Sequence, residues 1–272
     1  MCPVAFFDSP RPLVFAHRGG CALGPENTTA AFDIGAAAGA DGLELDVHLS
    51  SDGVVVVCHD PTLDRTTNGT GPVARLTADE LARVDAGYRF VDRTGAHAFR
   101  GQGVGIPTLP EVLRRYPEHR IIVEMKVDSP EMGAAVAEAV RAAGAAERVC
   151  AAGYGPRSLL AARTALPEMA TSACHPEVRL ALYRSWSGWP VRRVPYRGYQ
   201  VPERAGLLRV VSPRFVRHAH DAGLSVQVWT VDEEAEMKRL LAWGVDGLIS
   251  NRPDMAVATR NAVAPPPPHP AS

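Results

Sequence analysis

The sequence lacks the features that mark membrane-spanning proteins and disulfide-bonded secreted proteins. No apolar run in it approaches the roughly 20 residues that a membrane-spanning helix needs. The N-terminus has no basic segment followed by a long apolar one, so we expect no signal peptide. The five cysteines are scattered and none forms a CxxC pair, which argues against a disulfide framework and a structural zinc site. We therefore expect a cytoplasmic protein with reduced thiols.

The chain also lacks an excess of charge of either sign. Its formal net charge is −1, so nothing electrostatic favours nucleic acid or an anionic membrane. We expect no nucleic-acid partner and no stable membrane association, and composition leaves the oligomeric state open. A hydrophobic fraction of 46% is enough for a sizeable core and argues against disorder. The length of 272 residues suits an α/β barrel.

Strand-like and helix-like segments alternate along most of the chain. The eight strand candidates lie near residues 14, 44, 122, 150, 171, 199, 227 and 248. Predicted helices lie in residues 28–39, 109–116, 130–143, 158–165, 177–186, 213–222 and 232–243. Alternation of this length favours a closed (β/α)8 TIM barrel over an open sheet. The sixth strand is the weakest candidate, because residues 184–209 are crowded with Arg, Pro and Gly.

One stretch, residues 60–106, breaks this alternation. It contains a polar turn cluster at residues 66–71 and three closely spaced glycines near its end. We interpret it as a small insertion after the second strand, within a single domain over residues 1–262. The Pro-rich residues 263–272 are predicted to be a disordered tail without a functional site.

Acidic side chains lie on two of the predicted strands. The two-residue period of a strand directs Glu44 and Asp46 to one face, and it pairs Glu124 with Lys126 in the same way. Buried carboxylates are costly unless a cation compensates them. Three of them from neighbouring strands suit a hard divalent ion, either Mg²⁺ or Ca²⁺. The alternative is a set of structural salt bridges with Arg18 and Lys126.

An Asp-Gly turn predicts the position of His59. Residues 52–53 join two β-rich segments, which is a strong hairpin signal. Folding residues 54–59 back on residues 44–49 places positions opposite each other when their numbers sum to about 103–105. His59 then lies opposite the stretch from Glu44 to Asp46. A histidine beside carboxylates has a reason to transfer protons, whereas an isolated one at a strand end is usually structural.

His17 and Arg18 end the first predicted strand, where active sites of barrels lie. Arg18 has a bidentate fork suited to phosphate or carboxylate, and the two following glycines leave room for a ligand. A plain turn is the alternative. Trp229 ends a later strand and belongs either to the core or to a pocket lining. Other histidines are expected to be incidental or structural: His48, His175, His218 and His220. A basic group is either a solvated face or attracts an anionic substrate: Arg192, Arg193 and Arg197.

In this order, the segments resemble the glycerophosphodiester phosphodiesterase family. The resemblance covers residues 12–256 and rests on an ordered set of motifs, each of which is weak alone. They are His17-Arg18-Gly19, Pro25-Glu26-Asn27-Thr28, Glu44-Leu45-Asp46-Val47, Asp52-Gly53, His59-Asp60, Leu63-Asp64-Arg65-Thr66-Thr67, Pro107-Thr108-Leu109, Glu124-Met125-Lys126, Val228-Trp229-Thr230 and Gly244-Val245-Asp246-Gly247. The resemblance implies a TIM barrel with a small insertion after the second strand.

The resemblance also implies roles for single residues. It implies metal ligation by Glu44, Asp46 and Glu124. It implies His17 and His59 as the acid–base pair. The implied contacts to phosphate or substrate are Arg18, Lys126, Glu26, Asn27 and Trp229. The chain departs from many relatives at residues 250–251, where Ser-Asn replaces Thr-Asp.

The implied reaction is hydrolysis of a small glycerophosphodiester to an alcohol and glycerol 3-phosphate, with one divalent cation, Mg²⁺ or Ca²⁺. The alternative is a lysophospholipase D or sphingomyelinase-D-like enzyme on the same barrel, which needs an apolar groove for an acyl chain. Three clustered acids argue against a metal-free phosphatidylinositol-specific phospholipase C. Two histidines argue against a non-catalytic binding protein. The polar composition of residues 60–106 and the absence of an evident amphipathic basic helix favour water-soluble substrates.

Overall fold

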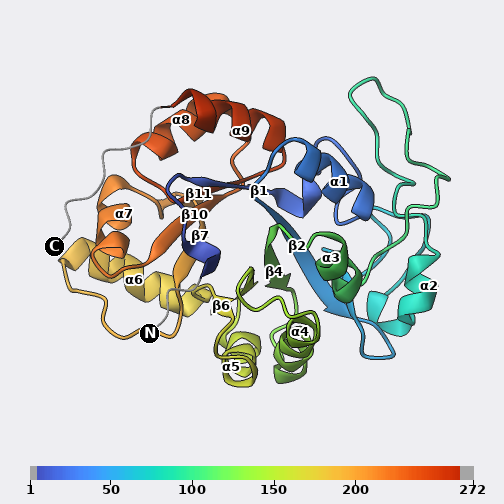
Figure 1. The fold of residues 1–272 in the computed structure, drawn as a ribbon, viewed down its shortest axis with the longest axis horizontal. Coiled ribbons are helices and arrows are strands. Elements are labelled where there is room, and N and C mark those ends of the chain that lie inside the picture. Colours follow the sequence, from blue (N-terminus) through green and yellow to red (C-terminus); the bar gives the residue numbers. More distant parts are fainter. Residues whose placement is uncertain (1–4, 264–272) are drawn as a thin grey trace.

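Eight parallel strands form a nearly closed barrel (Figure 1). The structure is a computed structural model that describes residues 5–263. The strands are β1 (Leu13–Ala16), β2 (Gly42–Leu49), β4 (Arg120–Met125), β5 (Val149–Gly153), β6 (Ala170–Thr171), β7 (Gly198–Pro202), β10 (Ser225–Trp229) and β11 (Gly247–Ser250). Their order is β6-β5-β4-β2-β1-β11-β10-β7, and a parallel bridge from Ser172 to Gly198 joins the two ends. The predicted TIM barrel and all eight strand positions are therefore confirmed.

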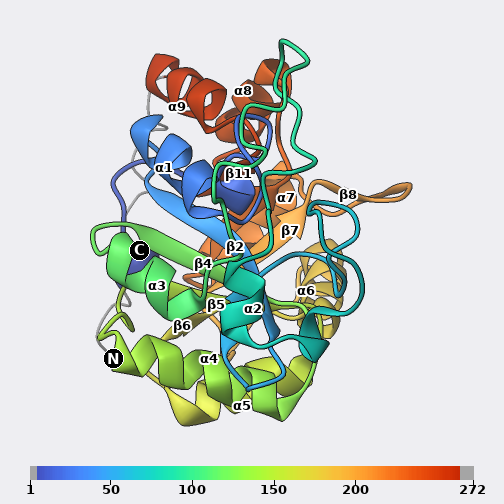
Figure 2. The ribbon, with the colours of Figure 1, turned by 90° about the vertical axis from the view of Figure 1, so that its right-hand side faces the viewer.

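Helices cover the outside of the barrel (Figures 1 and 2). They are α1 (Thr29–Ala37), α3 (Leu109–Arg115), α4 (Pro130–Ala142), α5 (Pro156–Ala165), α6 (His175–Ser187), α7 (Pro213–His220), α8 (Glu234–Ala242) and α9 (Pro253–Ala262). The first begins where the Thr28 hydroxyl accepts a hydrogen bond from the Ala31 amide. Helix α9 was not predicted, although a proline at its first position was a usable signal. Within residues 5–263, none of the helices is long and apolar enough to cross a membrane.

The interior of the barrel is apolar at one end and polar at the other. Phe6 from the N-terminal 3-10 turn, η1 (Ala5–Phe7), stacks on Phe15 of β1 and closes the end where the strands begin. On β2, Leu43, Leu45 and Val47 pack in the main core. The two acids of β2 alternate with these apolar residues, as the two-residue strand period predicts. The fold thus keeps the polar groups at the end where the strands terminate.

The hairpin after β2 has the predicted register. Strand β3 (Val55–Val57) pairs antiparallel with β2, with Val47 opposite Val57 and Leu49 opposite Val55, so paired numbers sum to 104. Residues 60–106 then leave the barrel and return at α3. They include η3 (Val73–Arg75) and α2 (Ala78–Ala82) and form a small apolar cluster together with Val56 and Cys58. Figures 1 and 2 show this excursion beside α1 and α3.

Two details near the weak sixth strand differ from expectation. The strand predicted over residues 169–174 is limited to β6, because the chain turns early into α6. A short hairpin that was not predicted follows β7, with β8 (Arg204–Ala205) and β9 (Leu208–Arg209) joined through Gly206, whose φ is 60°. The hairpin projects from the barrel in Figure 2. The predicted tail lies outside the described residues except for residue 263.

Candidate active site

Three carboxylates meet at the polar end of the barrel. Parallel pairing of β2 with β4 sets Asp46 beside Glu124, and Glu44 lies two residues earlier on the same face. One oxygen from each of the three lies within 4.8 Å of the others. The side chains of Glu44 and Asp46 are buried, whereas Glu124 is partly exposed. The sequence-predicted acidic cluster is therefore brought together by the fold.

The cluster holds more negative charge than its surroundings balance. Burial raises the pKa of the Glu44 carboxyl well above its ordinary value, and the charges of Asp46 and Glu124 raise it further. Burial followed by repulsion from Asp46 also raises the pKa of Glu124. Burial opposes ionisation of Asp46, but Lys126 and Arg18 hold its pKa below the ordinary value. Such an uncompensated set of hard oxygen donors fits a divalent cation.

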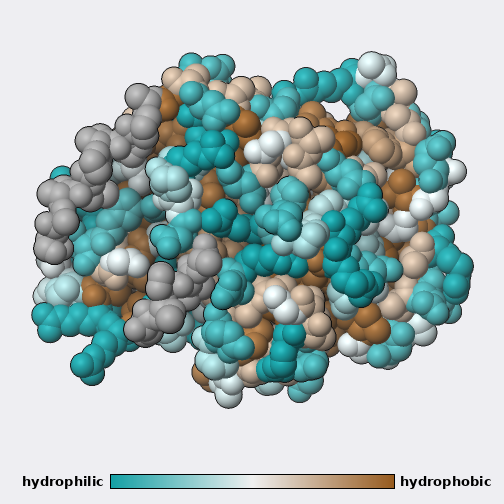
Figure 3. Space-filling view, viewed as in Figure 1, coloured by the Kyte–Doolittle hydropathy of each residue, from teal (hydrophilic) through white to brown (hydrophobic). Residues whose placement is uncertain are grey.

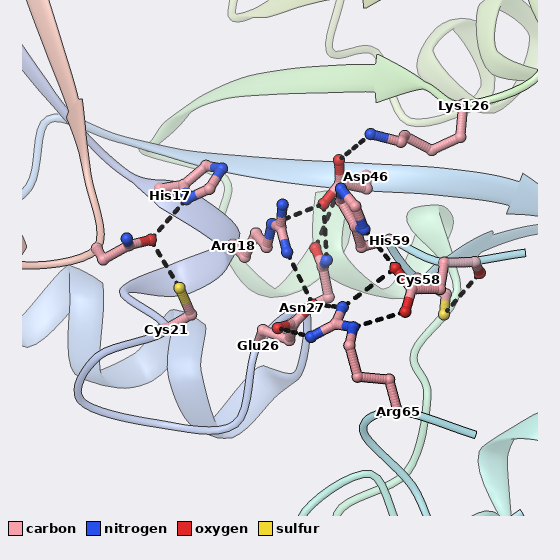
Figure 4. Close-up of polar contacts among 12 residues, drawn as sticks. His17, Arg18, Cys21, Glu26, Asn27, Asp46, Cys58, His59, Arg65 and Lys126 are labelled. Carbon is pink, nitrogen blue, oxygen red and sulfur yellow. Dashed lines mark hydrogen bonds and ion pairs between the residues drawn. The ribbon is translucent and has the colours of Figure 1, made fainter. Parts of the chain in front are cut away.

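Two cationic side chains reach Asp46 from opposite sides (Figure 4). Lys126 Nζ lies 3.3 Å from Asp46 Oδ1 and 3.4 Å from Glu124 Oε1. Arg18 Nε lies 3.3 Å from Asp46 Oδ2. That buried nitrogen still lacks a hydrogen-bond acceptor among the residues that the structure describes. The ion pairs of the salt-bridge alternative are present, but Arg18 Nε makes no aligned hydrogen bond within the described residues.

A tight turn fixes Arg18 at the end of β1. The backbone of Arg18 has φ of 50° and Gly19 has φ of 87°, in the left-handed region that most residues avoid. A Cβ at Gly19 would lie 2.8 Å from the backbone of Ala31, so the turn requires glycine there. The Arg18 amide donates to Glu44 Oε2 at 2.9 Å. The strained turn therefore ties Arg18 to the acidic cluster.

Asn27 locks Asp46 in place. Its Nδ2 donates to Asp46 Oδ2 at 2.9 Å, and its Oδ1 accepts from the Asp46 amide at 3.2 Å. The Asn27 backbone has φ of 59° and its amide donates to the Arg18 carbonyl. Glu26, the preceding residue, binds Arg18 Nη1 at 3.1 Å. Glu26 and Asn27 of the Pro-Glu-Asn-Thr motif thus point toward the site and support it (Figure 4).

His17 is held by Asn251, which the sequence marks only as a departure from the family pattern, and through it by Asp232, which the sequence does not single out. Its Nδ1 lies 2.6 Å from Asn251 Oδ1, while Asn251 Nδ2 donates to Asp232 Oδ2 at 2.6 Å. Because Nδ2 is the donor, Oδ1 must accept, so His17 Nδ1 carries the hydrogen. The other ring nitrogen then lies 3.8 Å from Glu44 Oε2. Burial is the main cause that lowers the pKa of His17. The sequence signals for Asn251 were its position just after the last strand and its place in the Ser-Asn pair that replaces Thr-Asp.

His59 belongs to a chain of charges on the opposite side of the cluster. Its Nδ1 lies 2.6 Å from Asp60 Oδ1, and Arg65 Nε binds Asp60 Oδ2 at 2.6 Å. Arg65 also binds Glu26 at 2.7 Å, which joins this chain to Arg18 (Figure 4). The hydrogen bond from Arg65 is the main cause that lowers the pKa of Asp60 to about 2. The sequence indicates Arg65 only as part of a motif, because its spacing alone predicts no carboxylate partner.

The remaining histidines differ in part from expectation. His48 is buried and its Nε2 contacts the carbonyl of His59 at 3.1 Å, so it supports the hairpin rather than being incidental. His175 stacks on Tyr154, and His218 contacts a backbone carbonyl. His220 has a carboxylate partner that its sequence spacing does not indicate, because its Nε2 lies 2.8 Å from Asp246 Oδ2, just before β11.

Trp229 lies at the end of β10 with 42% of its surface exposed, so the alternative that placed it in the core is wrong. It borders a cavity of about 540 Å³ beside the β8–β9 hairpin. Its lining mixes charged side chains, such as Glu203 and Arg239, with apolar ones, such as Val231 and Trp243. Arg192 and Arg193 are exposed on the segment that precedes β7, away from this cavity lining.

Comparisons with known proteins agree on one family. The family model described as the glycerophosphoryl diester phosphodiesterase family matches residues 17–255. A glycerophosphodiester phosphodiesterase of Caldanaerobacter subterraneus is 32% identical over 252 residues, covering 91% of this chain and 97% of that protein. A solved structure, a putative glycerophosphoryl diester phosphodiesterase from Silicibacter pomeroyi, is 26% identical with a TM-score of 0.76, covering 93% of this chain and 95% of that chain.

One further solved structure contains a bound small molecule. It is a phosphodiesterase from Oleispira antarctica in complex with the product sn-glycerol-3-phosphate. It is 25% identical to this chain, with a TM-score of 0.72, and the alignment covers 92% of this chain and 97% of that one. Fold, ordered motifs and full-length similarity thus agree, and the chain belongs to the glycerophosphoryl diester phosphodiesterase family of enzymes.

Proposed function

We propose that the protein hydrolyses small glycerophosphodiesters to an alcohol and glycerol 3-phosphate, using one divalent cation and two histidines. The observation that carries this proposal is the convergence of three carboxylates, two cationic side chains and two histidines at one end of the barrel. The product complex of the Oleispira antarctica relative supports the choice of product. Membership of the family supports the reaction class.

Glu44, Asp46 and Glu124 would hold the cation, Mg²⁺ or Ca²⁺. When bound there, such an ion supplies positive charge for the phosphoryl oxygens and acts as a Lewis acid. The raised pKa values of Glu44 and Glu124 support this assignment, because a bound cation would offset the burial and mutual repulsion that disfavour their ionised forms. Asp46 is already ionised through its contacts with Lys126 and Arg18.

Arg18 and Lys126 are proposed to bind the phosphate. Both are cations at the edge of the cluster, and Arg18 Nε is a buried donor without an acceptor among residues 5–263. A guanidinium matches two phosphate oxygens at once, and an ammonium adds a point charge. Donors fixed before the reaction stabilise charge that develops in the transition state without reorganising. Glu26 and Asn27 act indirectly by holding Arg18 and Asp46.

His17 and His59 are proposed to transfer protons. Each ring is oriented through Nδ1, by Asn251 for His17 and by Asp60 for His59, which leaves Nε2 available. One histidine removes the proton of the attacking group, which is water or the glycerol 2-hydroxyl, and the other protonates the leaving oxygen of the alcohol. Attack by water gives glycerol 3-phosphate directly, whereas attack by the 2-hydroxyl gives a cyclic phosphate that water must then open.

Small, water-soluble substrates fit the surroundings of the site better than lysophospholipids. The gap between His59 and the excursion of residues 60–106 has a volume of only about 10 Å³, about enough for one water molecule. The rim beside it consists of the ion pairs of Arg65 with Glu26 and Asp60. The larger cavity is lined by charged groups together with Trp229, Val231 and Trp243. An acyl chain needs a continuous apolar groove, whereas charged side chains interrupt the apolar residues of this cavity.

Turnover of glycerophosphocholine with and without a chelator tests the metal part of this proposal. We expect activity to be lost in EDTA and restored by Mg²⁺ or Ca²⁺, and E124Q to need more cation for half-restoration. Full activity after verified removal of metal would contradict the metal assignment. Competition between glycerophosphocholine and lysophosphatidylcholine tests the substrate, and a higher kcat/KM for the lysolipid would favour the phospholipase D alternative.

A further inference from the structure

The outer face of α6 carries large apolar side chains that contact solvent. Leu180, Tyr183 and Trp186 are 50%, 55% and 47% exposed, and Trp189, just after the helix, is 72% exposed. Residues three apart on a helix are neighbours, and the rings of Tyr183 and Trp186 lie 5.5 Å apart. These four residues define what we call the α6 apolar face. Figure 3 shows brown and pale residues over α6 beside strongly hydrophilic ones.

Positive charge is concentrated in the same part of the chain. Residues 175–220 contain nine arginines, two glutamates and neither lysine nor aspartate, so this segment carries +7 in a chain of net charge −1. The two glutamates are already paired with arginines, Glu177 with Arg163 at 3.0 Å and Glu203 with Arg239 at 2.6 Å. The remaining surface charge of the segment is therefore strongly positive.

Several of these arginines border the α6 apolar face. Arg179 lies next to Leu180 on the exposed side of α6, and Arg192 and Arg193 are exposed shortly after Trp189. Arg214 on α7 donates to the Trp186 carbonyl at 2.6 Å, which places a guanidinium from the neighbouring helix at the edge of the face. Apolar side chains thus lie near several arginines on the outside of the barrel.

We propose that the α6 apolar face docks on an anionic phospholipid bilayer. Tryptophan and tyrosine suit the boundary between headgroups and acyl chains, and arginines attract acidic headgroups. A second copy of the chain fits poorly, because a symmetric contact would bring two segments of charge +7 together. Single-stranded nucleic acid binds in positively charged grooves, whereas α6 presents a convex helix with an exposed leucine.

This inference goes beyond the proposed function and departs from the expectation drawn from net charge. A net charge of −1 averages over an asymmetric distribution, and it is the local charge that acts within a Debye length of a surface. Phospholipids from which both acyl chains have been removed are glycerophosphodiesters, so a deacylation at a bilayer would release this enzyme's proposed substrate near the docked protein. The face itself contains none of the residues placed in the catalytic site.

Co-sedimentation with vesicles tests the proposal. We expect the intact chain to sediment with vesicles of phosphatidylcholine containing phosphatidylglycerol, but weakly with phosphatidylcholine alone, and added salt to release it. Each basic residue near an anionic surface is worth roughly a fivefold change in partitioning, so R192S/R193S should lower it by roughly tenfold or more. W186S/W189S should also lower it. V91S removes a side chain that is 50% exposed on the distant excursion and should have no effect.

The following results would overturn the proposal: no sedimentation with either vesicle, equal sedimentation with both, or no change in R192S/R193S and W186S/W189S. Competition by a single-stranded oligonucleotide at low vesicle concentration would identify nucleic acid instead. A dimer in analytical ultracentrifugation that W186S/W189S abolishes would identify a second copy. Turnover of glycerophosphocholine and the melting temperature should be unchanged in all these variants, so failure here is distinguishable from failure of the proposed function.

Discussion

Replacing Glu44 with glutamine should stabilise the metal-free protein while impairing its function. The three carboxylates have oxygens within 4.8 Å of one another. At an effective dielectric constant of about 20, each fully charged pair at that distance repels by roughly 3 kcal/mol. Lys126 and Arg18 offset part of this repulsion, so we expect E44Q to gain about 1–2 kcal/mol, or roughly 2–6 °C in melting temperature.

The pH dependence gives this prediction a sign. Burial and the neighbouring acids raise the folded-state pKa of Glu44 above the ordinary value of 4.5. The folded state therefore binds the proton more tightly than the unfolded state, and stability falls as pH rises from the ordinary pKa through the folded-state pKa. Glutamine mimics the protonated form and keeps an oxygen for the Arg18 amide. The gain of E44Q should therefore be small in acid and should grow toward alkaline pH.

Thermal denaturation in EDTA, at several pH values, measures this effect. E118Q is a matched control, because Glu118 is an exposed carboxylate outside the cluster and its replacement should change stability by less than about 0.5 kcal/mol. Added Mg²⁺ or Ca²⁺ should stabilise the wild type more than E44Q. A lower melting temperature for E44Q in EDTA at alkaline pH would refute the reasoning, because it would mean that Arg18 and Lys126 balance the acids as structural salt bridges.

Three further predictions concern the histidines and their supports. H59A should lower kcat by about 10²–10⁴-fold with an unchanged circular dichroism spectrum and melting temperature, and a loss below about tenfold would mean that His59 transfers no proton. N251L removes the acceptor that orients His17, so it should lower kcat by about tenfold or more at an unchanged KM. N251D keeps an acceptor and should keep most activity. Equal losses in both variants would contradict an orienting role for Asn251. D60N should lower the melting temperature slightly at neutral pH. This difference should fade between about pH 4 and about 2, because the folded-state pKa of Asp60 is lowered to about 2 and the carboxylate stops contributing to stability once it is protonated. A D60N effect that grows in acid would contradict that sign.

Sequence periodicity alone determined much of the barrel and part of the site. The strand positions followed from short apolar segments between helix signals, because local burial on both faces of a parallel strand leaves a strong pattern. The Asp-Gly turn set the hairpin register, and the two-residue strand period put Glu44 and Asp46 on one face. These inferences succeeded because each depends on residues that are close together in the chain.

Tertiary structure alone decided how the site is supported. Asn251 meets His17 across 234 positions of sequence, because β11 and β1 pair when the barrel closes. Arg65 joins Asp60 to Glu26 only because the excursion returns over the first loop. The α6 apolar face has the same origin, since a helix pattern does not say which side the barrel leaves uncovered. Such contacts depend on closing long loops, and local sequence carries no signal for the partner at the far end.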